Sequence, residues 1–77
     1  VALAFELPTP QVVQFEVFDL FGRRVRTIVA SKLFESGRHT ITWDSRNADG
    51  RLSPAGVYSI RMVAGNVTMS RRVVFIR

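Results

Sequence analysis

The sequence has no cysteine, one histidine, three prolines and five glycines among its 77 residues. The absence of cysteine excludes disulfides and zinc sites built on thiolates, and a single histidine excludes a two-histidine metal motif. Charged residues interrupt every apolar stretch before it reaches the ~20 residues that a membrane-spanning helix needs. We therefore expect no transmembrane segment and no covalent cross-link.

The length allows one small domain, and we assign residues 1–77 to a single unit. A chain of this size buries only a little over ~60% of the surface that it exposes when unfolded, so its core must be economical. The sequence begins at Val1 rather than at methionine, and it lacks the basic and then apolar pattern of a signal peptide. We interpret it as a fragment or processed module of a longer protein.

The charge is strongly positive: eleven Lys and Arg residues against six Asp and Glu give a net charge of +5, and ten of the eleven cations are arginine. This balance favours anionic partners, among them nucleic acid, phospholipid and lipopolysaccharide. Arg71 and Arg72, however, must point to opposite faces of a strand, and no row of surface aromatics offers bases a stacking platform. The sequence therefore disfavours nucleic acid, and arginines at sheet edges also serve to prevent aggregation.

Apolar residues alternate with polar ones at the period of β-strands, as Leu3, Phe5 and Leu7 do at the start of the chain. Residues 30–36 fit either a short helical turn or an irregular crossover. A strand spacing of ~8–12 residues, without a helical pattern, predicts an all-β antiparallel sandwich of about seven strands. The expected strands include residues 1–7, 12–20, 25–29, 38–44, 57–64 and 67–76.

Turn-forming residues separate these strands. Phe21-Gly22-Arg23 predicts a tight turn, and Asp44 to Gly56 forms the longest loop, which is rich in Asp, Asn, Ser and Gly. Gly65-Asn66 predicts a hairpin in which both residues have positive φ.

The residues that catalysis needs are not assembled in this pattern. His39 falls within a predicted strand, where we expect a partly exposed polar side chain, and no serine lies in the Gly-x-Ser-x-Gly elbow of hydrolases. Glu6 and Glu16 fall on polar strand faces, and the aspartates fall at turns, where Asp accepts hydrogen bonds from nearby backbone. We assign no catalytic residue and predict that the module is not an enzyme.

The loop from Asp44 to Gly56 is the place where a metal ion has to be considered. An EF-hand register with Asp49-Gly50 at the fifth and sixth positions leaves serine first and glycine last, so two essential ligands are missing. A looser calcium cluster of Asp44, Asn47 and Asp49 stays open, although a stack of Asx turns is the preferred interpretation. No metal-binding or cofactor-binding residue is assigned, and no cofactor is expected.

Four stretches of the sequence together resemble one family. They are residues 15–29 (FEVFDLFGRRVRTIV), 37–51 (GRHTITWDSRNADGR), 56–62 (GVYSIRM) and 71–77 (RRVVFIR). In order and spacing they are similar to the FlgD-like immunoglobulin-like domains and to the closely similar C-terminal sorting domains of type IX secretion cargo. Ser45 stands where the pattern of this family has glycine after Trp-Asp.

The resemblance implies a non-catalytic immunoglobulin-like β-sandwich at the C-terminus of an exported bacterial protein. The implied function is sorting and secretion or attachment to the cell surface, with the secretion machinery and anionic lipopolysaccharide as partners. The implied location is secreted or cell surface. The alternative is a structural, self-assembling or scaffold subunit, similar to a hook cap or a filament, that assembles through its edge strands. A carbohydrate-binding module is a third alternative, weakened by the scarcity of surface aromatics.

We interpret the residues that match this pattern as determinants of the fold. Phe15, Trp43 and Tyr58 are expected to supply much of the buried area, because each large aromatic ring buries ~150–250 Å². Asp19 and Gly22 are expected to shape a turn, Asp by accepting backbone hydrogen bonds and Gly by adopting positive φ.

Overall fold

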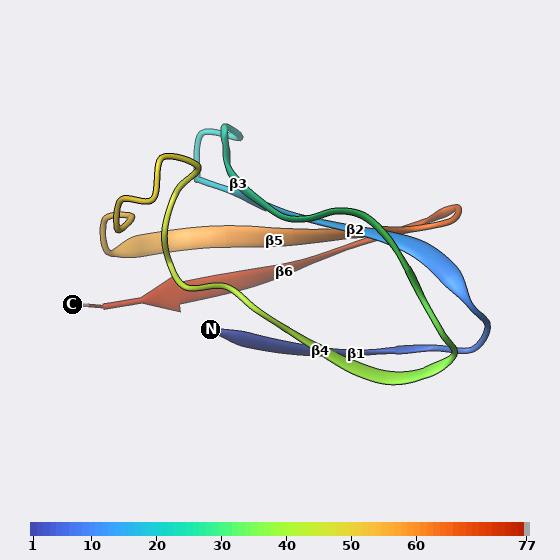
Figure 1. The fold of residues 1–77 in the computed structure, drawn as a ribbon. Coiled ribbons are helices and arrows are strands. Elements are labelled where there is room, and N and C mark those ends of the chain that lie inside the picture. Colours follow the sequence, from blue (N-terminus) through green and yellow to red (C-terminus); the bar gives the residue numbers. More distant parts are fainter. Residues whose placement is uncertain (77) are drawn as a thin grey trace.

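The computed structural model describes residues 1–76 and contains six β-strands in two layers (Figure 1). In the described part of the chain, no helix is long and apolar enough to cross a membrane. The strands are β1 (Ala2–Leu7), β2 (Gln11–Phe18), β3 (Arg24–Phe34), β4 (Gly37–Thr42), β5 (Gly56–Ala64) and β6 (Val67–Phe75).

The strand count is six among the described residues, so the prediction of about seven is wrong. A separate difference concerns residues 30–36, which were expected to form a short helical turn or an irregular crossover. Instead, β3 runs on to Phe34, because its second half pairs with β2 through Val13 opposite Lys32 and Gln11 opposite Phe34. Register shifts along β2 and β3 bend this long pair without ending it.

The strands form two antiparallel sheets, which confirms the all-β class and agrees with an immunoglobulin-like sandwich. One sheet has the order β3-β2-β5-β6, and the other contains only β1 and β4. The second sheet continues one step past β4, because Val1 and Trp43 exchange both of their backbone hydrogen bonds, at 3.0 and 2.8 Å.

The core lies between the two layers and follows the period-two alternation of the sequence. Phe15 and Trp43 are fully buried and Tyr58 is buried, as expected from the family pattern. The Trp43 and Tyr58 rings meet edge to face, with their centroids 5.4 Å apart. The other buried apolar residues of the described chain are Leu3, Leu7, Val13, Val17, Ile41, Ile60, Met62 and Ala64.

The hairpin between β5 and β6 differs in one detail from the prediction. Gly65 has φ 59°, but Asn66 is not among the described residues with positive φ. A positive φ at the first central position alone is the pattern of a type II′ turn, which needs glycine only there. The turn therefore does not need Asn66 to adopt a left-handed conformation.

Candidate functional site

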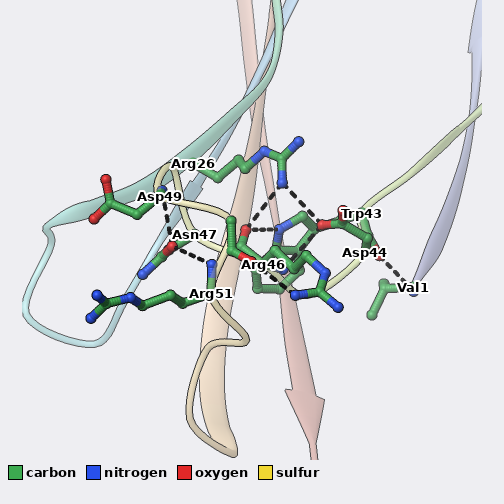
Figure 2. Close-up of polar contacts among 9 residues, drawn as sticks. Val1, Arg26, Trp43, Asp44, Arg46, Asn47, Asp49 and Arg51 are labelled. Atoms are coloured by element: carbon green, nitrogen blue, oxygen red, sulfur yellow. Dashed lines mark hydrogen bonds and ion pairs between the residues drawn. The ribbon is translucent and has the colours of Figure 1, made fainter.

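The β4–β5 loop is held by side chains that accept hydrogen bonds from the loop's own backbone (Figure 2). Asp44 Oδ1 accepts from the Arg46 N–H at 3.0 Å, and Asn47 Oδ1 accepts from the N–H groups of Asp49 and Arg51, each at 3.0 Å. These contacts confirm the predicted Asx turns. The looser calcium cluster of Asp44, Asn47 and Asp49 was only an open alternative, and nothing in the geometry tests it.

Trp43 fixes this loop to the core. Its ring is 1% exposed, and its Nε1–H donates to the Arg46 carbonyl at 3.0 Å. Arg26 reaches the same loop from β3 and donates to Asp44 Oδ1 at 3.0 Å, while the Ala48 N–H donates to the Val25 carbonyl at 3.1 Å. The loop is therefore tied to both sheets (Figure 2).

The β2–β3 turn lies at the same end of the sandwich, and Asp19 shapes it as predicted (Figure 1). Asp19 Oδ1 accepts from the N–H groups of Phe21 and Arg23, each at 2.9 Å, and Gly22 has φ 78°. The backbone hydrogen bond from Arg23 is the largest of the contacts that lower the pKa of the Asp19 carboxyl below its ordinary value. The carboxylate thus fixes the backbone of the turn through two hydrogen bonds.

The tip of the turn projects two large apolar side chains into solvent. Leu20 is 72% exposed and Phe21 is 82% exposed, and the Arg23 guanidinium lies 5.1 Å from the centroid of the Phe21 ring. The sequence analysis placed Leu20 at the end of a strand and Phe21 in a tight turn, and it assigned neither of them a function; β2 in fact ends at Phe18. Their signal is an apolar pair between Asp19 and Gly22, at a position where a turn cannot reach the core.

A cleft of about 580 Å³ separates this tip from the β4–β5 loop. Its walls are partly apolar, and Tyr58 at its base donates its hydroxyl proton to the Pro54 carbonyl at 2.6 Å. Arg24 and Asp49 add charge to the lining. An exposed apolar tip beside a partly apolar cleft with charged groups is suited to contact with another polypeptide.

Glu16 is the residue whose environment differs most from the prediction of a polar, solvated strand face. It does lie on the outer face of β2, but it is 5% exposed, because Arg24 and Arg61 cover it. Each guanidinium donates to one carboxylate oxygen at 3.1 Å. These hydrogen bonds, with that of Arg24 the larger, lower the pKa of Glu16 despite its burial.

His39 lies half-buried in β4, as expected of a strand residue. Its ring stacks on Phe5 with centroids 5.4 Å apart, and its Nε2 is 2.7 Å from the Glu35 carbonyl oxygen. Glu6, the other carboxylate predicted on a polar face, is exposed on β1. No group of three His, Cys, Asp or Glu side chains placed to hold a metal ion occurs within residues 1–76.

Two kinds of comparison place these features among known proteins. The family model described as the FlgD Ig-like domain matches residues 1–67. Two curated relatives, the basal-body rod modification proteins FlgD of Salmonella typhimurium (strain LT2) and Salmonella typhi, are each 42% identical to this chain over 50 residues. The matched region is 65% of this chain but only 21% of each relative's length.

These relatives correct the predicted location. The expectation of a secreted or cell-surface protein came from the sorting-domain branch of the resemblance. The curated relatives are instead named for modification of the basal-body rod, so the predicted location is wrong.

Proposed function

Because the chain belongs to the FlgD Ig-like domain family, we propose that it is a non-catalytic structural module of a protein that assembles the flagellar rod or hook. The observation that carries this proposal is the family match over residues 1–67, which includes the Asp19 turn, the Trp43 anchor and the β4–β5 loop.

The polar groups at the loop end support a structural role. The oxygens of Asp19, Asp44 and Asn47 accept hydrogen bonds that hold turns, and each of them therefore has a structural task. The features left for a partner are the apolar pair Leu20 and Phe21 and the cleft beside it. A tip whose turn is held by hydrogen bonds is suited to a contact between proteins in an assembly.

A chimera tests the proposal. In Salmonella typhimurium, the region of FlgD that aligns with this chain is replaced with the 77-residue chain. We expect the chimera to restore swarming in soft agar and hooks on isolated basal bodies, relative to a strain without FlgD. A chimera carrying Trp43→Ala, which removes the core anchor, serves as the unfolded control. A chimera that accumulates normally but leaves cells as non-motile as the deletion strain contradicts the proposal.

The loop tip is tested in the same chimera. Phe21→Ser is expected to reduce swarming while leaving the thermal midpoint of the isolated chain unchanged, because the ring is almost fully exposed. Leu33→Ser, an exposed apolar residue near the other end of β3, is the matched control and is expected to swarm normally. Equal swarming of both variants would argue against a contact at the tip.

The type IX sorting interpretation stays a prediction. It came from the resemblance alone, and both the family match and the curated relatives concern FlgD. The partners that it implied, the secretion machinery and lipopolysaccharide, are untested.

A further inference from the structure

The two layers of the sandwich are unequal, and this leaves part of the inner surface uncovered. Four strands face two, so the smaller sheet cannot reach across the larger one. On β5, the inward residues Ile60 and Met62 are buried, but their partners across the ladder on β6, Arg71 and Met69, are exposed, with Met69 at 57%. The inner face of β6 therefore lacks a covering strand at Met69 and Arg71, whereas Val73 farther along the strand packs against the core.

The strand that borders this gap is β1, and its outer edge is unpaired. Because Val1 and Trp43 exchange both hydrogen bonds, alternation directs the N–H and C=O groups of Leu3 and Phe5 towards β4. The same alternation directs those of Ala2, Ala4 and Glu6 away from β4, towards the open side. This edge can accept one more antiparallel strand.

A groove of about 270 Å³ lies between the β1 edge and the inner face of β6. Apolar side chains supply most of its lining, and Ile60, Met62 and Met69 belong to the larger sheet. A strand added to β1 would place alternate side chains over these residues. Unpaired backbone groups of the β1 edge and an apolar groove floor thus occur together at one site.

The charge of the groove indicates which strand would fit. Arg71 lines the groove on the inward side of β6, and within the described chain it has no ion pair with a carboxylate. Glu6, the other charged residue of the lining, belongs by alternation to the outward set of β1. An inward carboxylate on the added strand would therefore pair with Arg71, in keeping with the net charge of +5.

A second copy of this chain cannot supply the strand by symmetric pairing of two β1 edges. The inward residues of β1, which are Leu3, Phe5 and Leu7, include no carboxylate that could pair with Arg71. The donor must instead be a strand that carries a carboxylate on its inward face.

We propose that the β1 edge and the groove accept a single extended strand of a partner protein, with apolar residues alternating on one face and a carboxylate opposite Arg71. The inference rests on the proposed function, because an assembly module needs such a partner. It names the surface and the chemistry of that contact.

The probe is a nine-residue peptide with valine at the odd positions and threonine at the even ones, except that the central residue, position five, is glutamate. The glutamate therefore lies on the same face as the valines. A second peptide has lysine at the centre. Titration into the ¹⁵N-labelled 77-residue chain, followed by NMR, is expected to shift and protect the amides of Ala2, Ala4 and Glu6, while those of Leu3 and Phe5, already bonded to β4, change little. The glutamate peptide is expected to bind about tenfold more tightly than the lysine peptide.

Two charge reversals on adjacent residues provide the matched comparison. Arg71→Glu is expected to reverse the preference between the peptides, because Arg71 faces the groove. Arg72→Glu changes the net charge equally but lies opposite Ser59 on the outer face, so it is expected to leave the preference unchanged. Ala4→Pro removes an edge N–H and is therefore expected to abolish binding. The variant is expected to fold, because an edge strand tolerates proline.

The inference is overturned if the amides of Ala2, Ala4 and Glu6 do not respond to either peptide, or if both arginine variants change the preference equally. The chimera distinguishes the two proposals. Restored swarming without strand binding overturns only this inference. Strand binding in a chain whose chimera fails to swarm overturns only the proposed flagellar role.

Discussion

At the scale of single residues, Ser45 carries the clearest backbone strain. It is the one described residue other than glycine with positive φ, at 65°, and it stands where the family pattern has glycine. A left-handed conformation costs an L-residue about 1–2 kcal/mol, a cost that glycine avoids. Glycine in turn lowers the free energy of unfolding by about 0.5–1 kcal/mol, because its unfolded chain is more flexible. Ser45→Gly is therefore expected to stabilise the domain by about 0.5–1 kcal/mol in urea unfolding.

The control for this change is Ser36→Gly, at an exposed position before β4 that is not in the left-handed region. It is expected to be neutral or slightly destabilising. If both glycine variants shift the urea midpoint in the same direction, strain at Ser45 is not the cause.

Trp43 combines burial, a hydrogen bond and a backbone pairing in one residue. Trp43→Ala removes the largest buried side chain of the described core and its bond to the Arg46 carbonyl. We expect a loss of about 3–5 kcal/mol, enough to unfold a domain of 77 residues with ordinary stability. Circular dichroism and thermal melting measure the outcome, with the exposed Leu20→Ala as the control. An unchanged melting temperature would refute the core assignment.

At the scale of elements, the uncharged side chain of Asn47 holds the centre of the β4–β5 loop. Its Oδ1 accepts two backbone hydrogen bonds, from Asp49 and Arg51. Asn47→Ala is expected to destabilise the chain by about 1–2 kcal/mol and to speed hydrogen exchange at the Arg51 amide. Asn47→Asp keeps the accepting oxygen and is expected to stay within about 0.5 kcal/mol of the parent. Equal losses in both variants would show that the amide nitrogen matters instead.

The strands and turns could be predicted from the sequence wherever the residue types in a segment have a single structural role. Period-two alternation identified the inward faces of β2 and β5, and Asp19 with Gly22 identified a turn. The continuation of β3 through residues 30–34 could not be predicted, because the second half of this strand is mostly exposed and its apolar pattern is weak.

The candidate surfaces were harder to predict than the strands. The burial of Glu16 depends on two arginines from neighbouring strands, eight and 45 positions away along the chain. The groove beside β1 depends on how far one sheet extends past the other. Neither relation is local in sequence, so alternation within single strands cannot reveal it.

At the scale of the whole molecule, the unequal sheets and the excess of positive charge make the few carboxylates important. Six acidic residues face eleven basic ones, and Glu16 pairs with two of the arginines at once. Losing a carboxylate charge therefore removes favourable contacts and increases the repulsion among arginines. The stability of the domain is expected to respond to acid more than to mild alkali.

The acid response has a definite sign. The pKa values of Glu16 and Asp19 are lowered by folding from ordinary values of 4.5 and 3.8, so their contribution is complete above those values and is lost as the pH falls through the lowered ones. Glu16→Gln is expected to cost about 1–2 kcal/mol at pH 7, because its charged hydrogen bonds are lost, and to cost progressively less as the pH falls below the ordinary value of 4.5. Urea unfolding across this range measures the difference, with the exposed Glu6→Gln as control. A constant difference between Glu16→Gln and the parent at every pH would show that side-chain packing, not the charge beneath Arg24 and Arg61, is what Glu16 contributes.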